Sequence, residues 1–131
     1  MRTLLLMILA AVIGAIAAAQ ITGALRQRSA YQRAVMDMMA HHAGALDHSL
    51  RAQRCAATTT ANDFAVLGTV SGDIPQAFPE MMSDQHFAQL ANGARTTIGV
   101  VGGTPPVECV GLRKAIARIG ERCDACHREY R

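Results

Sequence analysis

The spacing of apolar residues constrains the fold of this chain more than any other feature of its sequence. After Pro106, apolar or sulfur-containing residues recur at alternating intervals of four and three: Leu112, Ile116, Ile119, Cys123, Cys126 and Tyr130. Residues at this spacing share one face of an α-helix. The segment is therefore predicted to be an amphipathic helix with one buried face. The same spacing recurs at Tyr31, Val35, Met38, His42 and Ala45, which predicts a helix from about Gln27 to about Gln53, before the threonines at 58–60.

Two further helices are predicted between these segments. The first is indicated by the stripe Phe64, Leu67, Val70 and Ile74. The second is indicated by the stripe Phe87, Ala91, Ala94 and Ile98. We expect Pro75 and Pro79 to end the former, because proline lacks the backbone donor that a helix needs. Ser83 is the expected N-cap of the latter, which should stop in the glycine- and proline-rich segment 99–106.

Composition supports an all-α fold. Aromatic residues make up only 4% of the 131 positions and Trp is absent, which disfavours a sheet rich in aromatic side chains. The length suits a single domain. Four amphipathic helices with short connections predict an antiparallel up-down-up-down four-helix bundle over residues 26–131.

The N-terminus has the order of charge, apolar run and small residues that is typical of an export signal. Arg2 precedes an apolar run from Leu4 to Ala19, so residues 1–19 are predicted to be a signal peptide that is cleaved after the alanines at 17–19. The alternative is an uncleaved membrane anchor that extends to Leu25. Both interpretations place the bundle outside the cytoplasm, and only the second attaches it to a membrane.

Charge and side-chain chemistry exclude two classes of function. The net charge is only +3 and the arginines are scattered, so we expect no nucleic-acid partner. No nucleophile–base pair or carboxylate dyad can be recognised by spacing, so we do not expect an enzyme.

The sequence Cys123-Asp124-Ala125-Cys126-His127 is a Cys-x-x-Cys-His motif on the last predicted helix. Two thiols three residues apart on one helical face can form thioethers to one porphyrin, and the adjacent imidazole can bind its iron. The motif therefore predicts one covalent haem c. The alternatives are half of a zinc site and a redox-active dithiol, but Cys55 and Cys109 lack the paired spacing of zinc ligands, and a thioredoxin-like fold needs strands.

With this motif at its C-terminal end, the chain resembles the cytochromes c′ and their low-spin, six-coordinate relatives. The resemblance rests mainly on residues 123–131, which match a Cys-x-x-Cys-His-x-x-aromatic-Arg ending, and also on the segments Tyr31 to Leu46 and Ala77-Phe78-Pro79-Glu80. It implies a bacterial periplasmic haem protein that transfers electrons to redox partners or binds diatomic gases such as NO and CO. It also implies a homodimer formed by the first two helices.

The resemblance further assigns individual residues. His127 is the implied proximal iron ligand, and Met36 is the residue facing the other side of the haem, where it either binds iron or only packs against the ring. Relatives carry Arg four residues before that position, where this chain has Gln32 followed by Arg33. Arg33 and Arg131 are thus the candidate partners of the haem propionates, with a solvated surface position as the alternative.

Two other groups of residues carry separate expectations. His41 and His42, preceded by two methionines, could form a copper site in a non-haem periplasmic module, or supply another axial ligand to haem. Neighbours on a helix diverge by about 100°, so one histidine should point inward and the other outward. In the predicted bundle Cys55 and Cys109 lie at the end opposite the haem motif, where they either form a disulfide or stay as separate thiols.

Overall fold

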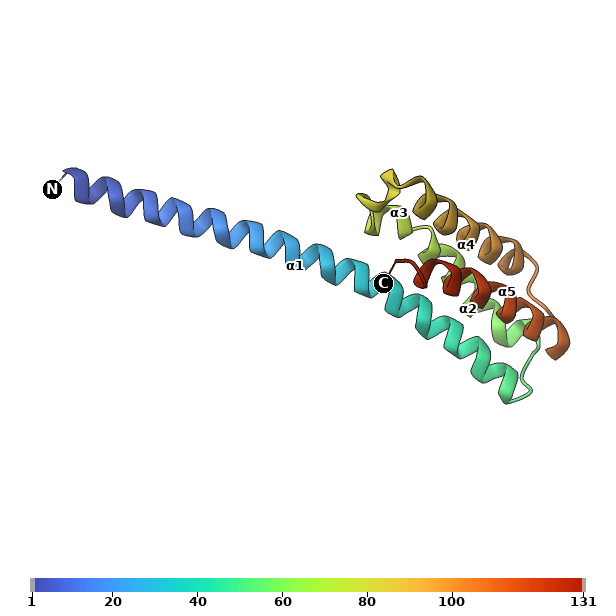
Figure 1. Cartoon of the computed structure of the whole chain (residues 1–131). Helices are drawn as coiled ribbons and strands as arrows, with labels where there is room; N and C mark the ends of the chain where they lie inside the picture. Colours follow the sequence, from blue (N-terminus) through green and yellow to red (C-terminus); the bar gives the residue numbers. More distant parts are fainter. Residues whose placement is uncertain (1, 131) are drawn as a thin grey trace. The chain divides into compact units, whose positions relative to one another are not determined.

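The computed structural model describes residues 2–130, apart from the side chain of Leu5. All regular secondary structure in this range is helical, as Figure 1 shows. The elements are α1 (Arg2–Arg51), α2 (Ala57–Ser71), α3 (Ile74–Ala77), the 3₁₀ helix η1 (Met81–Ser83), α4 (Gln85–Gly103) and α5 (Cys109–His127). The predicted all-α class is therefore confirmed.

The chain divides into two compact units, Met1–Arg33 and Ala34–Arg131. The helix expected from Gln27 is the later part of α1. In the first unit the large apolar side chains that the structure describes at Leu4 and between Leu6 and Leu25 are exposed to solvent. By length and composition alone α1 could cross a membrane, a test that an N-terminal signal sequence also passes.

The second unit is organised around α4, which packs against α2, α5 and η1. Its core contains residues of the stripes predicted at 64–74, 87–98 and 112–126. In the stripe predicted on α1 only Val35 is buried, whereas Tyr31 and Met38 are exposed; the buried apolar residues of α1 are Val35, Met39 and Leu46. Four residues from four helices are almost completely inaccessible to solvent: Leu46, Phe64, Ile98 and Leu112. Burial of side chains of this size is the main source of stability for such a unit, at roughly 1.5–3 kcal/mol each.

Gly102 allows α4 to approach α2 closely. A Cβ atom at this position would lie 3.3 Å from the carbonyl oxygen of Phe64 and 3.6 Å from the Phe64 Cβ. The absence of a side chain therefore lets the end of α4 pack directly on the α2 backbone.

Helix boundaries differ from expectation at three places. Asp84, not Ser83, caps α4, and its carboxylate accepts hydrogen bonds from the backbone of His86 and Phe87. Pro75 does not end α2 but lies in the first turn of α3, where its missing N–H would have had no helical partner. The threonines at 58–60 form the first turn of α2, and the break falls earlier, at Gln53, whose φ is 56°. Local spacing could not distinguish these neighbouring positions.

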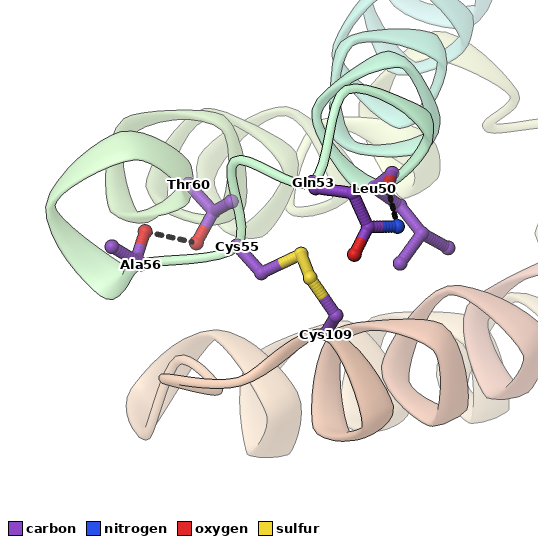
Figure 2. Close-up of a disulfide and its surroundings, with 6 residues drawn as sticks. All are labelled: Leu50, Gln53, Cys55, Ala56, Thr60 and Cys109. Atoms are coloured by element: carbon purple, nitrogen blue, oxygen red, sulfur yellow. Dashed lines mark hydrogen bonds between the residues drawn. A yellow bond between two sulfur atoms is a disulfide. The ribbon is translucent and has the colours of Figure 1, made fainter.

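A disulfide joins Cys55 to Cys109, with a Cα–Cα distance of 5.0 Å. Figure 2 shows that it links the connection after α1 to the first residue of α5. Cys55 is buried, and the nearby Thr60 hydroxyl donates to the carbonyl of Ala56 at 3.5 Å. The two connections, α1–α2 and α4–α5, are thereby held together at one end of the unit.

Candidate cofactor-attachment site

The Cys-x-x-Cys-His motif occupies the last turn of α5. Cys123 and Cys126 are free thiols, and both pack, partly buried, against the hydrophobic core. They continue the stripe of buried residues formed earlier in the helix by Leu112 and Ile119. His127 is the final residue of α5 and is exposed. One helix thus presents two thiols toward the core and an imidazole directly beside them.

Both thiols are shifted toward the protonated form. Burial raises the pKa of Cys123, and the charges of Asp124 and Cys126 add to the effect. Burial and the charge of Glu129 raise the pKa of Cys126. Redox-active dithiols need a lowered thiol pKa, because the thiolate is the reactive form. The surroundings of this pair are therefore the opposite of those of a thioredoxin-like site.

A set of contacts just beyond the motif fastens the end of α5 to the start of α4. The Tyr130 hydroxyl donates to Asp84 Oδ2 at 2.6 Å, and His86 Nε2 lies 2.8 Å from Glu129 Oε2. The Tyr130 ring also meets the Phe87 ring edge-on, with centroids 5.2 Å apart. We call these four polar residues and Phe87 the C-terminal clasp.

The hydrogen bond between Tyr130 and Asp84 shifts the pKa values of both side chains. The bond to Asp84 raises the pKa of Tyr130 to about 12. The same bond, together with the backbone N–H of His86, lowers the pKa of Asp84. Both shifts favour the state in which tyrosine is protonated and aspartate is charged, which is the state that makes the bond.

Methionine and aromatic side chains are among the partly buried residues that pack against the core of the second unit. This group includes Met36, Phe78, Met81, Met82 and Tyr130 as well as the two thiols. Phe78 is next to Phe87, with ring centroids 6.0 Å apart. Such flexible and flat apolar side chains suit the face of a large planar cofactor.

Neither predicted propionate partner belongs to the described part of the second unit. Arg33 is exposed and belongs to the first compact unit. Arg131 lies outside the described residues. Met36, in contrast, belongs to the second unit and packs against the core that also contacts the thiols.

His41 and His42 separate as helix geometry requires. His41 is exposed, whereas His42 is partly buried and its Nδ1 lies 2.7 Å from Asp63 Oδ1 on α2. The side chains of His42 and Asp63 are 14% and 17% exposed. Within residues 2–130 no group of three or more His, Cys, Asp or Glu side chains is arranged to hold a metal ion.

Sequence reasoning missed the polar members of the clasp. Asp84 follows Ser83 directly, and aspartate is also a preferred N-cap residue. The sequence could therefore have indicated a capping role for Asp84. Glu129 and His86 lie 43 residues apart in the chain, and no local pattern connects them. Comparison of the chain with protein-family models, curated proteins and solved structures gave no match.

The donor chemistry of the site fits covalent haem. Two unpaired thiols lie three residues apart and face the core, while the other two cysteines are joined to each other. An imidazole follows immediately, and a thioether, Met36, borders the same core. Thiols, an imidazole and a thioether are the kinds of side chain that attach haem c and bind its iron in proteins generally.

Proposed function

We propose that this protein is an exported mono-haem c-type cytochrome of the cytochrome c′ kind, which transfers electrons or binds diatomic gases in the bacterial periplasm. The observation that carries the proposal is the pair of free, core-facing thiols in the last turn of α5, followed directly by His127. In this proposal residues 26–131 form an up-down-up-down four-helix bundle, and residues 1–19 are the export signal.

The residues take distinct roles in this function. Cys123 and Cys126 hold the cofactor covalently, His127 binds iron on one side, and Met36 is the candidate ligand on the other. Haem, when bound, supplies the redox-active, gas-binding iron. The protein keeps water from the core side through the apolar residues around the thiols, and the clasp holds the last turn of α5 in place. Arg33 and Arg131 remain proposed propionate partners, and redox partners and a homodimer remain proposals by resemblance. Nothing in these roles requires an enzyme.

Cysteine substitution tests the attachment chemistry directly. The protein is produced in a bacterial periplasm that matures c-type cytochromes, and haem is extracted with acidified acetone. We expect a Soret band that stays with the polypeptide in the wild type, and its loss in Cys123→Ala/Cys126→Ala. The matched control, Cys55→Ala/Cys109→Ala, removes the same number of cysteines, here the disulfide-bonded pair, and should retain covalent haem. A wild-type protein without a Soret band would refute the proposal.

A second candidate function is a copper-binding module centred on His42. The observation that favours it is the contact of His42 Nδ1 with Asp63, because a carboxylate on one ring nitrogen orients the other toward a metal. The His41 ring lies beside it, with centroids 5.0 Å apart. Copper binding that is abolished by His42→Ala, in a protein that matures without haem, would support this alternative.

A further inference from the structure

Most of the exposed large apolar side chains of the second unit lie at the end where α4 turns into α5. In residues 34–130 the exposed large apolar side chains are those of Met38, Val100, Val107 and Val110. Three of these four, which we call the valine patch, lie at this end and are 60%, 71% and 61% exposed. Exposed apolar side chains that gather at one place are typical of surfaces that bind another molecule.

A groove of about 260 Å³ adjoins the valine patch. It is lined by Val100, Val101, Thr104, Pro106, Gly111, Lys114, Ala115 and Arg118. The groove is shaped before any partner arrives: a Cβ on Gly111 would lie 3.0 Å from the Cβ of Pro106, so the connection packs tightly on α5. The disulfide at Cys109 also fastens this connection to the one after α1. A preformed groove loses little conformational entropy when it is filled.

Positive charge borders the groove on one side. Lys114, Arg118 and Arg122 follow one another at intervals of four along α5, so they share a face of the helix, and all three are exposed. None of them forms an ion pair with any residue of the described range, although other cations of the unit do, as Arg51 does with Asp47. These charges are therefore free to meet an acidic group from outside.

We propose that this groove, with the valine patch and the three cations, is the docking site for a segment of a partner protein that combines apolar and acidic side chains. The apolar side chains would fill the groove while carboxylates approach Lys114 and Arg118. Complementary charge of this kind speeds encounter and selects the partner. A second copy of the chain fits poorly, because a two-fold contact would bring the same cations together. A membrane surface also fits poorly, because side chains of a peptide can enter a recessed groove whereas a flat lipid surface would lie across it.

The test uses the purified protein, in a zwitterionic detergent, with a fluorescein-labelled amphipathic helical peptide that carries leucine and glutamate. Binding is followed by fluorescence anisotropy. We expect Arg118→Glu to weaken binding by about tenfold, and higher salt to weaken it as well. Arg113→Glu is the matched control: Arg113 is exposed on the same helix but does not line the groove. Arg113→Glu should change the Kd by less than about twofold, because it changes the net charge as Arg118→Glu does but removes no charge from the groove.

Peptide variants and a second substitution complete the test. Peptides with lysine for glutamate, or serine for leucine, should not bind, and Val110→Ser should weaken binding while circular dichroism shows a folded protein. Should Arg118→Glu not fold, Lys114→Gln replaces it. Equal effects of Arg113→Glu and Arg118→Glu, or no peptide binding, would overturn the proposal. Two other results would also overturn it. The first is binding of the protein to phosphatidylglycerol vesicles that Arg118→Glu weakens and Arg113→Glu does not. The second is self-association of the protein in sedimentation velocity that Arg118→Glu abolishes. None of these outcomes depends on haem.

Discussion

The four cysteines of this protein differ in what surrounds their sulfur atoms, and this difference separates their roles. Cys55 and Cys109 meet across two connections and are joined, whereas Cys123 and Cys126 share one helical turn and stay free. Burial raises the pKa of both free thiols. They are consequently poor nucleophiles by themselves, which suits cysteines whose purpose is to carry a bound group.

Met36 is the residue whose substitution best separates two states of the proposed iron site. In Met36→Ala we expect a low-spin spectrum to become high-spin, and CO to bind, because the thioether that could occupy the sixth position is removed. Absorption spectroscopy of the oxidised and reduced protein provides the measurement. Met38→Ala is the control, since Met38 is exposed on the same helix. An unchanged spectrum in Met36→Ala would exclude Met36 as ligand.

Tyr130 should ionise at an unusually high pH. Its hydrogen bond to Asp84 raises its pKa to about 12, and a raised pKa means that the bond contributes stability below the ordinary value near 10 and loses it as the pH rises through about 12. The two tyrosines and the absence of Trp allow a direct measurement at 295 nm in a Tyr31→Phe background, with the Tyr130→Phe protein subtracted.

The carboxylate supplies the control for this titration. Removing it in Asp84→Ala should return the midpoint of Tyr130 toward 10, because the hydrogen bond is the largest cause of the shift. A midpoint near 10 in the protein that retains Asp84 would contradict the clasp.

At the scale of elements, the helices of the second unit are held at both ends by contacts that are distant in the chain. The disulfide fastens the α1–α2 connection to the start of α5, and the clasp fastens the end of α5 to the start of α4. Between these points α4 packs against α2 and α5 through buried apolar residues. The motif therefore lies on a helix that is fixed at its first and last turns.

Removing the disulfide should weaken the unit substantially. The two cysteines are 54 residues apart, and a chain-entropy estimate for a closed loop of that size gives about 4 kcal/mol. We expect Cys55→Ala/Cys109→Ala to lower the free energy of unfolding in urea by up to about this amount. Dithiothreitol should destabilise the wild type to a similar level and leave the double variant unchanged. Equal stability of the two proteins under oxidising conditions would contradict the prediction.

At the scale of the whole molecule, the two units have opposite surface chemistry. The first exposes apolar side chains along α1, whereas the second buries its apolar stripes in a core. An apolar helical segment of this length is typical of a signal peptide that is cleaved off or of an anchor that lies in a membrane. The second unit has a packed interior, which agrees with the proposed export of this part of the chain.

Processing of the N-terminus can be measured on the protein from a bacterial periplasm. We expect cleavage after the alanines at 17–19, so that intact-mass spectrometry finds a chain beginning near Gln20 and the protein appears in the soluble periplasmic fraction. Replacing Ala17 and Ala19 with bulky residues should block cleavage and move the protein to the membrane fraction. An unprocessed wild type in the membrane would show that the apolar segment serves as an anchor.

The sequence by itself determined the all-α class and the core-facing stripes of the helices that follow α1, because the repeat of 3.6 residues is a local property of a helix. On α1 the predicted stripe was wrong at Tyr31 and Met38, which are exposed, and only its Val35 is buried. It also determined the candidate motif, since all five of its residues are contiguous. The inward and outward orientation of His42 and His41 followed from the same geometry and is confirmed.

Only the tertiary structure decided which distant groups meet. The contacts of Tyr130 with Asp84, of His86 with Glu129 and of His42 with Asp63 join residues that are far apart in the chain. The N-cap of α4 is Asp84 and not the predicted Ser83, because the Asp84 carboxylate accepts hydrogen bonds from two backbone N–H groups. Hydrogen bonds between elements depend on the register and separation of whole helices, which result from the packing of many side chains at once and leave no mark in a short stretch of sequence.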